Sequence, residues 1–85
     1  MQQFLFELRS MPGWLIKEYL LELGGYLSDD NWIVGSGWKA NIIKMPDFQI
    51  GSLRVGQVRL EWWGDDNAVK DVLPALEQKM MRAGG

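Results

Sequence analysis

Residues 57–63 read QVRLEWW, and this stretch decides the fold because its two sides differ in character. Side chains of a strand alternate between two faces. One face of this stretch is wholly apolar, with Val58, Leu60 and Trp62. The other face is mixed, with Gln57, Arg59, Glu61 and Trp63. The sequence therefore predicts a strand with one face in the core, and it places Trp62 and Trp63 on opposite faces of a sheet.

A final helix is predicted after this strand. Gly64-Asp65-Asp66-Asn67 closes the strand and supplies several possible N-cap side chains. Apolar residues then recur at spacings of three and four: Val69, Val72, Leu73, Leu76, Met80 and Ala83. Pro74 lies off this stripe. Because a proline inside a helix removes one backbone hydrogen bond, we expect a kink there or a first turn that starts late.

Short strands are predicted before residue 57. Asp29-Asp30-Asn31 and Gly35-Ser36-Gly37 are turn signals, and they separate short runs rich in Trp, Ile and Val. Two or three short antiparallel strands are therefore expected over residues 26–46. The apolar alternation in residues 48–55 slips by one position near Gly51-Ser52, which predicts a bulge or a tight turn.

The first 27 residues predict one strand and one amphipathic helix. QFLFELR, residues 3–9, alternates as a strand does, while Pro12 and Gly24-Gly25 bracket a helix. The apolar side of that helix is predicted to hold Ile16, Tyr19, Leu20, Leu23 and Leu27. The whole order, β-α-β4-α, predicts a single α+β domain over residues 1–85, with two helices on one face of a mostly antiparallel sheet.

Composition excludes several kinds of chemistry. The chain has 85 residues, is 47% hydrophobic and contains neither Cys nor His, which removes disulfides, thiol nucleophiles and imidazole catalysis. Its net charge of −2, without a basic cluster, argues against nucleic acid and anionic membranes as partners. No apolar run approaches the roughly 20 residues that span a bilayer. We expect a cytoplasmic protein without a cofactor.

Two groups of carboxylates are candidate metal ligands. Asp29-Asp30 and Asp65-Asp66-Asn67 carry suitable oxygen atoms, but neither has the spacing of a calcium loop, and turn or helix-cap roles explain both. No paired-carboxylate, nucleophile-base or Gly-rich phosphate motif is present. We therefore expect no metal site, no catalytic residues and no enzyme activity.

The tryptophans give the remaining binding signal. With only two helices, one face of the sheet stays open, and Trp63 is expected there with Trp38 or Trp32 nearby. Exposed aromatic side chains often mark protein interfaces, yet tryptophans also lie half-buried beside loops without binding anything, so both interpretations stay open. Arg59 and Glu61 share this face, where they either pair across strands or hold a ligand. The candidate binding residues are Trp63, Trp38, Trp32, Arg59 and Glu61.

Two segments, PGWLIKEYLLELGG (12–25) and IGSLRVGQVRLEW (50–62), resemble the C-terminal domain of bacterial MoaD-related proteins. The first half of those proteins is a ubiquitin-like domain similar to the small subunit of molybdopterin synthase. The resemblance runs from about Phe4 to Gly64 and implies a TBP-like fold of order β-α-β4-α. It is a domain family of unknown function, and it implies a link to molybdenum-cofactor or sulfur-transfer proteins by association only. The present chain lacks the ubiquitin-like half.

The chain ends in MRAGG, residues 81–85. Ubiquitin-like sulfur carriers use a free Gly-Gly terminus for adenylation and thiocarboxylation, but Gly84-Gly85 follows a predicted helix, so a glycine-terminated helix end is the simpler explanation.

Two function classes remain. The first is a non-catalytic interaction or accessory domain that forms a homodimer or binds a protein partner, such as a ubiquitin-like sulfur carrier or its enzyme. The second is a sulfur-carrier-like protein acting through Gly84 and Gly85.

A third and weaker hypothesis is a binder of a small apolar ligand, held in a cavity between the sheet and the long helix. Only analogy with folds of this general shape supports it.

Overall fold

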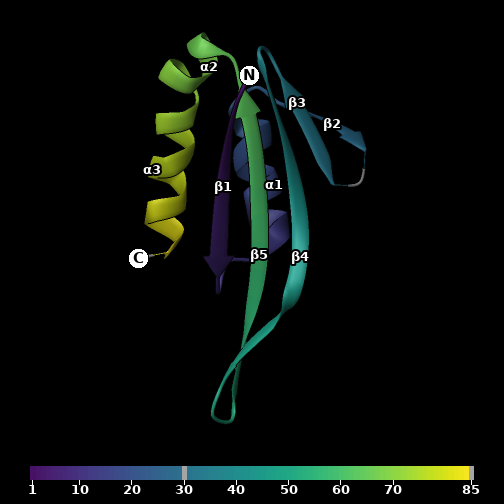
Figure 1. Cartoon of the computed structure of the whole chain (residues 1–85), viewed down its shortest axis with the longest axis vertical. Coiled ribbons are helices and arrows are strands. Elements are labelled where there is room, and N and C mark those ends of the chain that lie inside the picture. Colours follow the sequence, from purple (N-terminus) through teal and green to yellow (C-terminus); the bar gives the residue numbers. More distant parts are fainter. Residues whose placement is uncertain (30, 85) are drawn as a thin grey trace.

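The fold is built on one antiparallel sheet in the order β1-β5-β4-β3-β2 (Figure 1). The computed structural model describes residues 1–29 and 31–84. Its strands are β1 (Gln2–Arg9), β2 (Tyr26–Asp29), β3 (Trp32–Gly35), β4 (Trp38–Ile50) and β5 (Leu53–Gly64). Its helices are α1 (Gly13–Glu22), α2 (Asp66–Asp71) and α3 (Leu73–Gly84). This order confirms the predicted α+β class and its β-α-β4-α arrangement, with the final helix divided in two.

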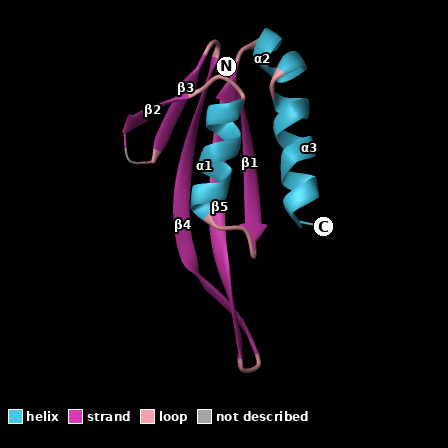
Figure 2. Ribbon diagram, turned by 180° about the vertical axis from the view of Figure 1, so that it is seen from behind, coloured by secondary structure: helices cyan, strands magenta, loops and turns pink. Residues whose placement is uncertain are grey.

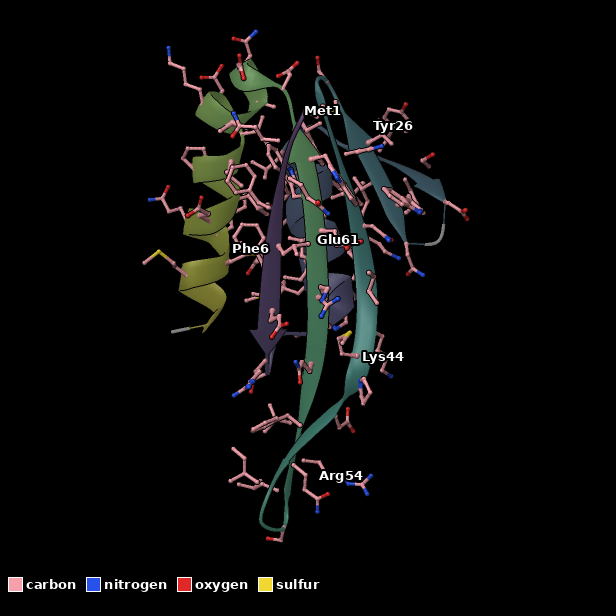
Figure 3. The ribbon with its side chains drawn as sticks, viewed as in Figure 1. Met1, Phe6, Tyr26, Lys44, Arg54 and Glu61 are labelled. Atoms are coloured by element: carbon pink, nitrogen blue, oxygen red, sulfur yellow. The ribbon has the colours of Figure 1, made fainter. Side chains whose placement is uncertain are left out.

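The strand β5 separates the two faces of the sheet as its sequence predicts. It pairs with β1 on one side and with β4 on the other. Val58, Leu60 and Trp62 are buried, and α1 and α3 cover this face (Figure 2). In the same layer, Phe6 of β1 lies between that strand and α3 (Figure 3). The opposite face carries no helix.

Two stacked tryptophans form the centre of the core. The ring centroids of Trp38 and Trp62 lie 6.3 Å apart with an angle of 23° between the planes. Gly35 and Gly64 lie against these indoles, where a Cβ atom would overlap the rings. The indole N–H of Trp62 is buried and has no hydrogen-bond partner among the described residues. Burying one large apolar side chain contributes roughly 1.5–3 kcal/mol, which is of the same order as the roughly 1–3 kcal/mol that one unpaired buried donor costs.

The ends of α1 follow the predicted signals. Pro12 precedes the first helical residue, and Gly24 takes a positive φ of 96°. The Gly24 N–H donates to the Leu21 carbonyl and the Gly25 N–H to the Leu20 carbonyl, each at 3.1 Å, which satisfies the last carbonyls of the helix. The helix therefore ends before Leu27. The prediction that Leu27 belongs to the helical stripe is wrong, because this residue lies in β2.

The last helical region is interrupted where its sequence predicts. The Asp65 carboxylate accepts a hydrogen bond of 2.8 Å from the Ala68 N–H and caps α2. α2 ends at Asp71 and α3 starts at Leu73, so Pro74 falls in a first turn, where its missing N–H leaves no backbone bond unmade. Of the two outcomes expected at Pro74, a kink or a first turn that starts late, the structure shows the second, because a new helix begins at Leu73.

The strand β4 is longer than expected. The sequence predicts only short strands over residues 26–46, but β4 runs from Trp38 to Ile50 and passes through Pro46. The register with β5 shifts between Met45 and Phe48, so Pro46 lies in a bulge, where the ladder does not need its N–H. The predicted turn at Gly51-Ser52 is confirmed, with a φ of 60° at Gly51.

The β4–β5 hairpin projects beyond the rest of the molecule (Figure 1). We call residues 46–55 the arm. Its paired residues give it two unlike sides. Phe48 pairs with Val55 and Ile50 with Leu53 on the apolar side, and Gln49 pairs with Arg54 on the polar side. Ile50 and Leu53, at the tip, are 59% and 67% exposed. The arm is thus an amphipathic ribbon whose apolar side is not covered at its end.

Candidate functional site

The candidate site is the side of the sheet that faces away from α1 and α3, which we call the open face. Figure 1 is viewed from this side, with α1 behind the sheet, and Glu61 lies near the centre of the view in Figure 3. Register fixes its members, because residues paired across antiparallel strands share a face. From β1 and β5 it takes Gln3, Leu5, Glu7, Arg9, Gln57, Arg59, Glu61 and Trp63. From β3 and β4 it takes Trp32, Val34, Lys39, Asn41, Ile43 and Met45.

Two tryptophans meet on the open face. The ring centroids of Trp32 and Trp63 lie 5.5 Å apart, with an angle of 22° between the planes. These residues belong to β3 and β5, which β4 separates, so the two indoles meet across the middle strand. Trp32 pairs with Asn41, whose small side chain leaves room above β4. Both rings are half-buried as a result.

A cation completes this group. The Lys39 Nζ atom lies 5.8 Å from the ring centroid of Trp32 and 5.4 Å from that of Trp63. These distances fall within the range of cation–π attraction, which contributes about 0.5–1 kcal/mol at an exposed site. We call Trp32, Lys39 and Trp63 the aromatic cluster. It presents flat apolar surface and one positive charge on a face that no helix covers.

Trp38 does not join the aromatic cluster. Of the two tryptophans expected near Trp63, Trp32 is the neighbour, whereas Trp38 is 2% exposed and lies on the other face. The physical reason is the alternation of β4, in which Trp38 and Ala40 face the helices and Lys39 faces Trp63. Placing Trp38 on the open face is therefore wrong. The residue that sequence reasoning missed is Lys39. Its position between the apolar residues Trp38 and Ala40 could have indicated it, because neighbouring residues of a strand lie on opposite faces.

Arg59 and Glu61 lie on the open face as expected. The Arg59 guanidinium is 3.5 Å from the Glu7 carboxylate, across β1 and β5. This confirms pairing across strands for Arg59, and because both side chains are well exposed, the pair contributes at most about 1 kcal/mol. Glu61 is half-buried between Leu5 of β1 and Asn41 of β4. A binding role for either residue stays a prediction.

The apolar side of the arm continues the open face. Leu53 and Val55 alternate in step with Gln57 and Trp63 along β5, so they share its side of the ribbon. The Arg9 guanidinium lies 3.9 Å from the centre of the Phe48 ring and joins the end of β1 to the arm. The open face therefore extends from the aromatic cluster at one end to the exposed tip of the arm at the other.

Among the described residues, the carboxylates that were candidate metal ligands do not gather into one site. Asp65 caps α2, Asp29 lies in β2, and Asp30 lies outside the described residues. Within residues 1–29 and 31–84, no three Asp or Glu side chains come together as a metal ion would require. In the same part of the chain, no helix has both the length and the apolar character needed to cross a bilayer.

The Gly-Gly terminus follows a helix, as the sequence predicts. α3 continues to Gly84, while Gly85 lies outside the described residues. In the described part of the chain, the backbone just before the terminus is thus helical and not an extended tail.

Comparison with known proteins gives a family. The family model described as archaeal MoaD-like protein matches residues 5–85, which include every helix and all but the first residues of β1. No curated protein matches the chain. The MoaD-like part of the resemblance is confirmed, while its assignment to the second domain of bacterial relatives stays a prediction.

Proposed function

We propose, because the chain belongs to the archaeal MoaD-like protein family, that it is a non-catalytic interaction or accessory domain serving molybdenum-cofactor or sulfur-transfer proteins. Family membership supports a small protein related to sulfur carriers or to the molybdenum cofactor. Family membership does not by itself decide whether this protein carries sulfur or binds the proteins that carry it. The open face favours binding, and the partner that we propose is a ubiquitin-like sulfur carrier or its enzyme.

The aromatic cluster is the observation that carries this proposal. Tryptophan, tyrosine and arginine are enriched among the residues that dominate protein–protein binding, particularly where the partner can exclude all water from a flat apolar surface. Trp32 and Trp63 hold each other in place by stacking, so they would lose little side-chain freedom on binding. Lys39 adds a charge that a partner carboxylate would satisfy.

The rest of the open face supports a protein as the partner. Charges of both signs alternate along it, with Glu7 and Glu61 beside Arg9 and Arg59. A mixed pattern of this kind suits a protein surface with its own mixed charges better than a uniformly charged polymer. The same pattern is compatible with a second copy of this chain, so a homodimer is the alternative outcome of the test.

The test compares a half-buried tryptophan on the open face, Trp63, with an exposed tryptophan on the other side of the sheet, Trp14. Trp63→Ala removes half of the stacked pair, whereas Trp14→Ala removes an indole that is 63% exposed on α1. The wild type and both variants would be purified untagged from the native host and measured by native mass spectrometry. We expect a bound protein with the wild type and with Trp14→Ala, and loss of that protein with Trp63→Ala at unchanged circular dichroism.

A second variant tests whether binding depends on the open face and not on a loss of folding in Trp63→Ala. Lys39→Glu reverses the charge of an exposed side chain beside the rings and leaves the stacked pair in place. If both Lys39→Glu and Trp63→Ala retained the bound protein, the open face would not be the docking surface.

A second candidate function is that of a sulfur carrier. The observation that favours it is the family match, which continues through Gly84 and Gly85. In this chemistry, ATP adenylates the terminal carboxylate with release of pyrophosphate, and a sulfur donor then displaces AMP to leave a thiocarboxylate. Intact mass spectrometry would detect a gain of about 16 Da at Gly85, as sulfur replaces oxygen. Because α3 is helical up to Gly84, the tail would also have to unwind to enter an activating enzyme.

A further inference from the structure

A cavity of about 580 Å³ lies on the helix-covered side of the sheet, away from the open face. The first turn of α1 and the loop before it form one wall, and β4 and β5 form the other at the base of the arm. Figure 2 shows this side, with the start of α1 next to the loop from β1 and the arm projecting beyond it. The volume falls in the range of about 300–1,000 Å³ that is usual for small-molecule sites.

The body of the cavity is apolar. Its walls include Met11 and Trp14 from the α1 side, and Ile42 and Val58 from the sheet. Trp14 is largely exposed, so its ring forms an edge of the opening. A flat ring with sulfur and aliphatic neighbours is a surface on which a planar apolar group packs well.

Among residues 1–29 and 31–84, the charges that line the cavity are positive. They belong to Lys17 of α1 and Lys44 of β4, and no acidic residue in this part of the chain lines it, although the whole chain has more acidic than basic residues. The ion pairs seen among the described residues are Arg59 with Glu7 and Lys79 with Glu22, so neither cavity lysine is neutralised there. The two ammonium groups come from different elements, one on each wall.

The start of α1 adds to this positive character. The N-cap position is occupied by Pro12, which makes no side-chain cap, and the first turn contains no acidic residue. The positive end of the helix dipole therefore faces the cavity without compensation at Gly13 and Trp14. Ser10 and Asn31 bring further hydrogen-bonding groups to the lining.

We propose that this cavity binds a small organic anion. Its planar apolar part packs against Trp14 and Met11, and its phosphate, sulfonate or carboxylate group lies between Lys17 and Lys44. This assignment is independent of the open face, because the two sites lie on opposite sides of the sheet.

The test uses a matched set of three probes. 2-Naphthyl phosphate carries both parts of the expected ligand, 2-naphthol carries only the apolar part, and inorganic phosphate only the anion. Each would be titrated into ¹⁵N-labelled protein and followed by amide chemical shifts. We expect saturable shifts of Gly13, Gly56 and Asn31 with 2-naphthyl phosphate, and binding at least about tenfold weaker for either half alone.

Charge variants then separate the anion contact from simple packing. Lys17→Gln and Lys44→Gln should each weaken 2-naphthyl phosphate binding about tenfold and leave 2-naphthol unchanged. Lys70→Gln, on exposed α2, is the matched control and should change nothing. The amide spectrum reports in the same experiment whether each variant is folded.

Three results would overturn the proposal. One is the absence of saturable shifts at the cavity. Another is equal affinity for 2-naphthol and 2-naphthyl phosphate, which would leave the lysines without a role. The third is unchanged binding in the Lys17→Gln/Lys44→Gln double variant.

Discussion

Trp62 and Trp63 are adjacent in β5, yet one is fully buried and the other lies half-buried on the open face. The alternation of a strand is sufficient to separate them. Each ring then finds an aromatic partner on its own face, Trp38 for Trp62 and Trp32 for Trp63. The adjacent pair therefore serves the core with one ring and the proposed interface with the other.

Gly35 tests how tightly the core tryptophans are held. A Cβ atom at this position would overlap the Trp38 indole, which is itself stacked on Trp62 and cannot move aside. Gly35→Ala should therefore lower the free energy of unfolding by about 1–3 kcal/mol, as overpacked cores do. Urea denaturation would measure this. Gly56→Ala is the control, because no atom lies within 4 Å of its Cβ position, and equal losses in both variants would contradict the account.

A substitution at Ser10 is predicted to raise the free energy of unfolding, whereas the one at Gly35 lowers it. It has a φ of 64°, a left-handed conformation that costs a non-glycine residue roughly 1–2 kcal/mol. Glycine avoids that cost but gives up roughly 0.5–1 kcal/mol in chain entropy. Ser10→Gly should thus raise the free energy of unfolding by up to about 1.5 kcal/mol.

Ser52→Gly is the matched control for this prediction, since Ser52 has no positive φ and gains nothing from the change. Thermal unfolding of the two variants would compare them. A lower midpoint for Ser10→Gly than for the wild type would mean that its backbone is not strained.

At the scale of elements, a change in the arm should affect partner binding without affecting the free energy of unfolding. Ile50 and Leu53 are exposed and far from the core, so Ile50→Ser/Leu53→Ser should change the free energy of unfolding by no more than about 0.5 kcal/mol per site. If the arm extends the docking surface, the same variant should weaken partner binding. Chemical denaturation and native mass spectrometry would measure the two effects.

Arg54→Ser is the control for that variant, because it alters the polar side of the same hairpin. A large loss of stability in the apolar variant would show that the tip packs against the body. Equal loss of binding in both variants would mean that the arm acts through its charge or its length, and not through its apolar side.

The limits of the sequence are clearest in β4. Local patterns predicted β1, α1, β5 and the interrupted final helix, because each rests on alternation, helical spacing or a proline within a few residues. The sequence predicts short strands over residues 26–46 and a separate apolar alternation over residues 48–55, so β4 is not predicted as one strand. Pro46 lies where these two stretches meet. Only the pairing with β5 reveals that a bulge absorbs the proline, and this pairing is not a local property.

The candidate site was predictable in part for the same reason. Alternation places Trp63, Arg59 and Glu61 on one face, and the alternation of β4 places Trp38 on the other, but neither pattern identifies Trp32 as the neighbour of Trp63. That contact depends on strand order, since Trp32 reaches Trp63 only because β4 lies between β3 and β5. Local patterns do not single out the cavity lysines, because Lys17 and Lys44 lie 27 positions apart in the sequence (44 − 17) and come together only in the fold.

At the scale of the whole molecule, both long helices pack on one side of a single sheet, and this asymmetry produces the open face (Figure 2). A sheet of this kind has one face committed to the core and one available to a partner.

The most direct test of the central claim is native mass spectrometry of untagged protein from its native host, with wild type, Trp63→Ala and Trp14→Ala compared side by side. The account predicts a complex, with a partner protein or a second copy, that survives Trp14→Ala and is lost with Trp63→Ala. A monomer in all three samples, or a complex that Trp63→Ala leaves intact, would contradict it.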